Sequence, residues 1–136
     1  MDRHRVGLWA TFIFALLVIV GMAVQVYLIG TFAFDSAGES GNDARDLHTD
    51  IGKIVHAGYI LTFIAALVAM WPNWRATGWA FTLAVLGTIQ AFLAGGDMSP
   101  GVHAFHAMLA PVVFVIAVVI AFRAWTAIRA TPAVAV

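Results

Sequence analysis

The sequence contains no cysteine, which excludes disulfides, thiol nucleophiles and cysteine-ligated zinc or iron–sulfur centres. Charged residues are also scarce, at 10% of the 136 residues, against about a quarter in an ordinary soluble domain. Seven basic residues balance seven acidic ones, so no net charge favours a nucleic-acid partner. Apolar residues reach 62% and the mean hydropathy is +0.95. This composition excludes a water-soluble monomer, a disordered chain and a secreted disulfide scaffold, and it predicts a small protein whose partner is the lipid bilayer.

Four runs without charged residues are each long enough to cross a bilayer, which takes about 20 mostly apolar residues. They lie between the charged residues at 5 and 35, 53 and 75, 75 and 97, and 97 and 123. We predict one domain over residues 1–136, with helices at about 6–34, 51–72, 76–96 and 101–127 and a Gly/Ser/Asp-rich outer loop at 35–50. Short links make consecutive helices antiparallel, so the predicted fold class is all-α, an integral membrane antiparallel four-helix bundle.

Basic residues fall on one side of the predicted bundle. These residues are Arg3, Arg5, Arg75, Arg123 and Arg129. The other side holds six of the seven acidic residues, with only Arg45 and Lys53 as basic residues. Because Lys and Arg are enriched in cytoplasmic loops, both termini are predicted to be cytoplasmic in a prokaryotic cytoplasmic (inner) membrane.

The histidines carry the most information about function. His4 belongs to the basic tip, where a solvated side chain is the simplest interpretation. His48, His56, His103 and His106 all fall at the outer end of the second and fourth predicted helices. Counted from the predicted helix starts, His56 and His106 lie at matching depth, about 7–8 Å in at 1.5 Å per residue. We therefore predict that they are a pair of ligands on two helices, because ionisable residues within membrane spans are rare and usually functional.

A broad, flat ligand suits the surroundings of this pair. Small residues near each histidine, among them Gly58 and Ala110, allow a planar group to approach the backbone, although small residues also pack membrane helices. Each ring could donate its second N–H to the carbonyl four residues earlier, which leaves the other nitrogen for a metal. Bis-histidine ligation of haem b iron fits these features. His48 and His103 remain as a possible second site for haem propionates, copper, zinc or a second haem, or as residues without such a role.

The segment from Gly87 to Gly95, followed by His106-Ala-Met-Leu109-Ala110, resembles the third-to-fourth helix portion of one half of a haem A synthase. His56 matches the second-helix histidine of that family. The resemblance implies a four-helix, bis-histidine bundle that carries a b-type haem. The acidic residue that precedes the second-helix histidine in the family's catalytic half is replaced here by Gly52 or Lys53. The chain is also similar to small four-helix membrane proteins of bacteria and archaea without assigned activity.

Three functions follow as hypotheses. The leading one is a haem b protein that transfers electrons near the outer face, alone, as a homodimer or as an accessory subunit of a larger respiratory or redox complex. The second is a structural or assembly subunit whose histidines are empty or bind copper or zinc. The third is an enzyme that modifies haem or a quinone. No catalytic residue set is visible, so an electron carrier is favoured over a catalyst, and Gln25, Tyr59 and Gln90 are interpreted as packing or interface residues.

Overall fold

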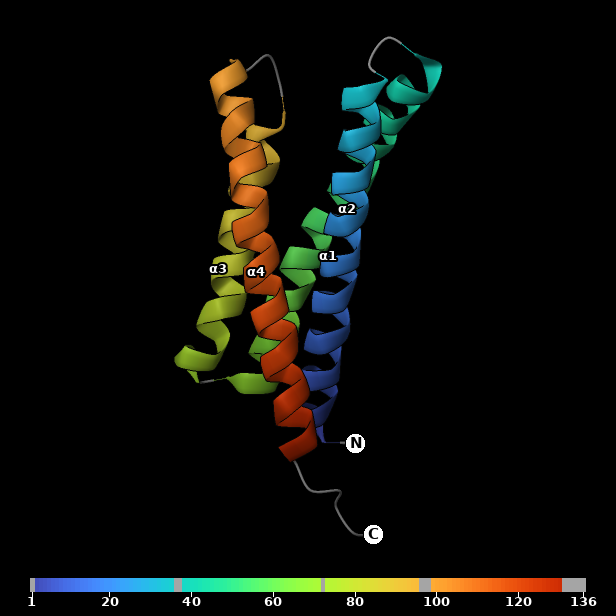
Figure 1. The fold of residues 1–136 in the computed structure, drawn as a ribbon. Coiled ribbons are helices and arrows are strands. Elements are labelled where there is room, and N and C mark those ends of the chain that lie inside the picture. The colour runs from blue at the N-terminus through green and yellow to red at the C-terminus, as the bar shows by residue number, and fades with distance from the viewer. Residues whose placement is uncertain (1, 36–37, 72, 96–98, 131–136) are drawn as a thin grey trace.

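The computed structural model describes residues 2–35, 38–71, 73–95 and 99–130, and every regular element in these ranges is a helix (Figure 1). The four helices are α1 (Arg3–Phe34), α2 (Glu39–Met70), α3 (Trp74–Leu93) and α4 (Pro100–Ala130). Each helix packs on its two neighbours, in the cyclic order α1, α2, α3, α4 and back to α1. The predicted all-α four-helix bundle is confirmed.

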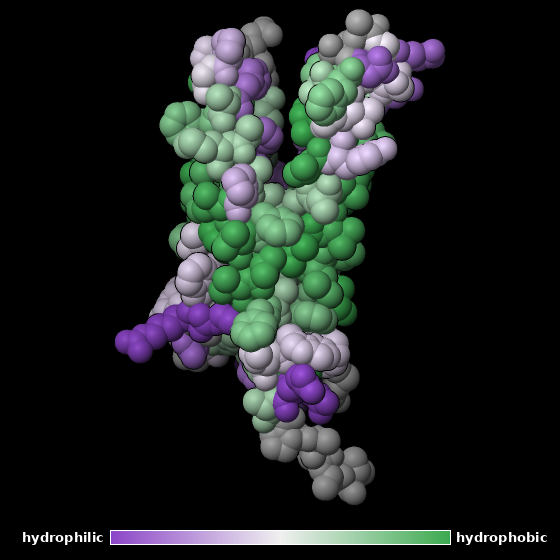
Figure 2. Space-filling view, in the orientation of Figure 1, coloured by the Kyte–Doolittle hydropathy of each residue, from purple (hydrophilic) through white to green (hydrophobic). Residues whose placement is uncertain are grey.

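Three of the four helices described have the length and hydropathy of membrane spans. α1, α2 and α4 are each 31 or 32 residues long and apolar enough to cross a bilayer. The apolar section of α3 is shorter, at Thr77–Leu93, but the 20 residues of this helix still extend about 30 Å, the thickness of the hydrocarbon core. Figure 2 shows an apolar belt around the middle of the molecule, with hydrophilic residues gathered at the two ends. The chain is therefore a membrane protein.

Helices α1 and α2 pack closely because small residues lie between them. A methyl group added at Gly7 would lie 2.7 Å from the backbone nitrogen of Ala69, and one at Gly58 would lie 2.9 Å from a Val18 methyl group. Small residues at such positions let membrane helices approach to backbone contact. The contact with Val18 accounts for Gly58 without a ligand, and Ala110 likewise packs against the apolar core.

The predicted outer loop at 35–50 was wrong for most of its length, because α2 begins at Glu39. Its Gly, Ser and Asp residues are typical of a loop, but Gly41, Ala44 and His48 continue the three- and four-residue spacing of the packed face of α2. Gly41 and Ala44 are buried, and Glu39 in the first turn suits the positive end of the helix dipole. The helix therefore extends about four turns before the apolar section that starts at Ile54.

His4 is exposed, as the sequence had suggested, but its ring also has a partner on α2. Its ring Nδ1 lies 2.5 Å from the carbonyl oxygen of Ala69. Because a carbonyl only accepts, the imidazole donates to one of the last carbonyl groups of α2, which have no partner within the helix. His4 thus joins the inner ends of α1 and α2.

Candidate functional site

A cleft opens between the α1–α2 hairpin and the α3–α4 hairpin, at the end of the bundle that the sequence predicts to face outward and that is called the outer end below (Figure 2). The main apolar core reaches outward as far as Met22, Val55 and Val113. Beyond that level the two hairpins diverge, as Figure 1 shows. The cleft therefore lies above a packed apolar floor, at the end of the molecule that carries four of the five histidines.

His48 on α2 and His106 on α4 lie near each other in this outer part of the molecule. Their ring centroids are 6.4 Å apart and the ring planes are inclined by 75°. Both side chains are half-buried. Two histidines from separate hairpins thus come together although 58 residues separate them in the sequence.

Each of these rings is held by a backbone carbonyl of the neighbouring helix. The Nδ1 atom of His48 lies 3.2 Å from the Gln25 oxygen on α1, and that of His106 lies 2.8 Å from the Gln90 oxygen on α3. Since carbonyls only accept hydrogen bonds, both Nδ1 atoms carry the proton. The lone pair is then on Nε2 in both rings, as in most metal-ligating histidines. The carbonyls lie on neighbouring helices, whereas the sequence had predicted carbonyls four residues earlier in the same helix.

The two hairpins repeat one arrangement. In each, a glutamine on the first helix accepts a hydrogen bond from a histidine on the second, Gln25 from His48 and Gln90 from His106. The Gln25 side chain adds a second bond, in which Nε2 donates to the His48 carbonyl at 2.7 Å. These glutamines were interpreted from the sequence as packing residues. Because both acceptors are backbone carbonyls, no residue type in the sequence could have identified them.

Helix register explains why His48, rather than the predicted His56, lies beside His106. At the inner end, Ala69 of α2 and Ile128 of α4 pack in one cluster with Leu8, which sets both helices to a common level. From that level His48 is 21 residues away and His106 is 22, which corresponds to about 32 and 33 Å at 1.5 Å per residue. His56 is only 13 residues from Ala69 and lies about two turns deeper. The depth predicted for His56 was wrong because it was counted from a helix start near residue 51, whereas α2 begins at Glu39.

The other two predicted histidines have different surroundings. The Nε2 atom of His56 is 3.1 Å from the Thr88 hydroxyl on α3, and its ring centroid is 6.4 Å from that of the buried Tyr59. This places His56 in the α2–α3 contact below the cleft. His103, one turn before His106 on α4, is exposed.

One buried polar atom near the site lacks a partner among the described residues. Gln90 is 7% exposed, and its side-chain Oε1 is buried without a hydrogen bond. An unpaired buried acceptor costs about 1–3 kcal/mol. The same residue holds His106 through its backbone carbonyl. The Gln90 side-chain oxygen therefore lowers stability and takes no part in holding His106.

The local electrostatics favour a neutral His48. This residue lies in the charged outer section of α2, before the apolar section that starts at Ile54. Burial lowers the pKa of His48 below its usual value, the bond to the Gln25 carbonyl opposes the shift, and the neighbouring His106 lowers the pKa further. A neutral imidazole keeps the lone pair that a metal requires.

The centroid separation of the two rings is comparable with that of two imidazoles on one metal ion. Ligand bonds of about 2.0–2.1 Å would place two ring centroids about 5 Å apart at a tetrahedral angle, and about 6.5 Å apart for ligands on opposite sides. The observed 6.4 Å, with the ring planes inclined by 75°, is closer to the second distance. Within the described ranges, no three His, Asp or Glu side chains gather closely enough to hold a metal ion. The protein donors that face each other at this point are therefore the two imidazoles.

Comparison of the chain with protein-family models, with curated proteins and with solved structures found no match.

Proposed function

We propose that this protein binds haem b in the outer cleft, with His48 and His106 as the axial ligands, and that it transfers electrons near the outer membrane face. The observation that carries the proposal is the pair of imidazoles 6.4 Å apart, each with Nδ1 bonded to a backbone carbonyl. The axial pair differs from the His56 and His106 pair that the sequence suggested.

The chain's residues would supply ligands, orientation and burial. His48 and His106 would each present a neutral Nε2, and the carbonyls of Gln25 and Gln90 would hold the two rings in place. The apolar floor would shield one edge of the site, and the open end would give access from the outer side. When bound, the haem iron supplies one-electron redox chemistry, whose potential the axial ligands and the burial set.

Absorption spectra of the detergent-purified protein, oxidised and dithionite-reduced, with a pyridine haemochrome assay, test this proposal. We expect a low-spin b-type spectrum with one haem per chain. His48→Ala or His106→Ala should abolish the low-spin spectrum, because each removes one axial ligand. His103→Ala, three residues from His106 on the same helix, is the matched control and should leave the spectrum unchanged.

The variant His56→Ala separates the two possible ligand pairs. If His56→Ala keeps the low-spin spectrum, His48 and His106 are supported as the ligands. If His56→Ala loses this spectrum and His48→Ala keeps it, the ligands are His56 and His106, the pair predicted from the sequence. A protein with no Soret band after expression with adequate haem would overturn haem binding altogether. Stoichiometric copper or zinc in such a colourless protein would instead favour an ion-binding assembly subunit.

A further inference from the structure

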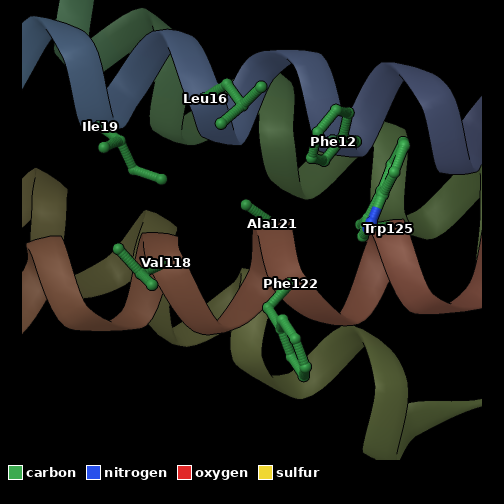
Figure 3. A pocket seen from close by; sticks show the side chains of 7 residues that line it. All are labelled: Phe12, Leu16, Ile19, Val118, Ala121, Phe122 and Trp125. Atoms are coloured by element: carbon green, nitrogen blue, oxygen red, sulfur yellow. The ribbon is translucent and has the colours of Figure 1, made fainter.

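A groove runs between α1 and α4 on the inner half of the molecule (Figure 3). Its volume is about 290 Å³ and all of its lining side chains are apolar. The lining consists of Phe12, Leu16, Ile19, Val118, Ala121, Phe122 and Trp125. Leu16 and Val118 are 40% and 41% exposed, so the groove is open along its side. Because α1 and α4 span the membrane at this level, the open side of the groove faces the acyl chains of lipids.

Aromatic rings close the inner end of the groove. Trp125 stacks on Phe12 with ring centroids 5.3 Å apart (Figure 3). Trp9 lies edge-on to Trp125, with ring centroids 6.1 Å apart. Tryptophan is enriched where the hydrocarbon core meets the lipid headgroups. The pair Trp9 and Trp125 therefore places this end of the groove at headgroup level.

A cation lies over the same end. The guanidinium carbon of Arg129 is 5.6 Å from the centroid of the Trp125 ring. Arg129 is exposed, and no acidic side chain in the described part of the chain forms an ion pair with it. Arg123 is also exposed, about one and a half turns earlier on α4. The headgroup end of the groove thus carries positive charge without an acidic partner, which is complementary to a phosphate.

We propose that this groove binds an anionic phospholipid, with one acyl chain along the apolar lining and the headgroup phosphate against Arg129. From Arg129 to Val118 is 11 residues, or about 16 Å along α4, which accommodates most of an ordinary acyl chain. Planar, always charged guanidinium groups are well suited to bind phosphate. This site is independent of His48 and His106, which lie at the opposite end of the bundle.

Native mass spectrometry of the full chain in detergent, titrated with dioleoyl phosphatidylglycerol or dioleoyl phosphatidylcholine, tests the lipid site. We expect the first lipid bound to show several-fold selectivity for phosphatidylglycerol. Arg129→Gln should weaken binding of that lipid about fivefold, as expected for one basic residue near a charged headgroup. Arg75→Gln removes the same charge in the first turn of α3, outside the groove, and should leave both affinities unchanged.

A second pair of variants tests the acyl-chain contact. Val118→Phe fills the groove and should weaken both lipids, whereas Val115→Phe, at an exposed valine of α4 that does not line the groove, should weaken neither. Equal binding of the two lipids by the unmodified protein, or equal effects of Arg129→Gln and Arg75→Gln, would overturn the proposal. Occupation of the groove by a second copy would also overturn it, and would appear as a dimer without bound lipid that Val118→Phe dissociates.

Discussion

Backbone carbonyls hold the two facing histidines. Because the Gln25 and Gln90 oxygens are fixed in the helix ladder of α1 and α3, the His48 and His106 rings are oriented by the helices themselves. A side-chain partner would have its own rotamers and would orient a ring less strictly. The only side chain that adds to this arrangement among the residues described is that of Gln25, through its bond to the His48 backbone.

Replacement of Gln25 by Leu should loosen His48 without removing it. The Gln25 carbonyl remains, but the 2.7 Å bond to the His48 carbonyl is lost. We expect haem affinity to fall about tenfold, at the low end of the range for residues that support a ligand. The measurement is haem titration of the apoprotein followed by absorption and by redox potentiometry, where the midpoint potential should also shift.

Gln90→Leu is the matched control for this variant. It keeps the carbonyl that holds His106 and removes a buried amide oxygen that lacks a partner. Haem affinity should change little, and stability should stay equal or rise by about 1 kcal/mol. If both variants lose haem equally, the Gln25 side chain has no specific role in positioning His48.

At the scale of the elements, the α1–α2 hairpin depends on close contact of its backbones, and the α2–α3 contact depends on a glycine as well. Gly87 of α3 lies against the ring of Tyr59, so closely that an added methyl group would overlap the ring. Tyr59 is 4% exposed and belongs to the apolar core. These contacts set the helix positions from which the histidines project.

Gly7→Ala should destabilise the bundle by about 1–3 kcal/mol, the usual cost of overpacking. The new methyl group would lie within 2.8 Å of the Ala69 backbone, which has no rotamer by which to move aside. Thermal unfolding in detergent, followed by circular dichroism, measures the change. Gly30→Ala on the same helix meets nothing within 4 Å and should be neutral or slightly stabilising. Equal destabilisation by both variants would show that the close contact at Gly7 does not limit stability.

For the whole molecule, orientation decides which compartment reaches the histidine pair. The outer section of α2 carries most of the acidic residues, and the opposite end carries Arg3, Arg5 and Arg129. The excess of Arg at that end predicts that it is cytoplasmic, which places the cleft on the outer side.

The absence of cysteine makes this orientation simple to measure. Asn42→Cys and Ala130→Cys each introduce one exposed thiol, at opposite ends of the bundle. A membrane-impermeant maleimide should label Asn42→Cys in intact spheroplasts, and Ala130→Cys only after permeabilisation. The reverse pattern would place both termini outside and open the histidine cleft to the cytoplasm.

The sequence by itself determined the membrane class, the four helices and the gathering of four histidines at one end. These follow from hydropathy and charge, which depend on residue type and short-range order along the chain. Tertiary structure alone decided that His48 lies beside His106, because that depends on how far α2 extends and on the helix register set by Leu8, Ala69 and Ile128. It also decided the roles of the Gln25 and Gln90 carbonyls, since a backbone acceptor on another helix leaves no mark in residue identity.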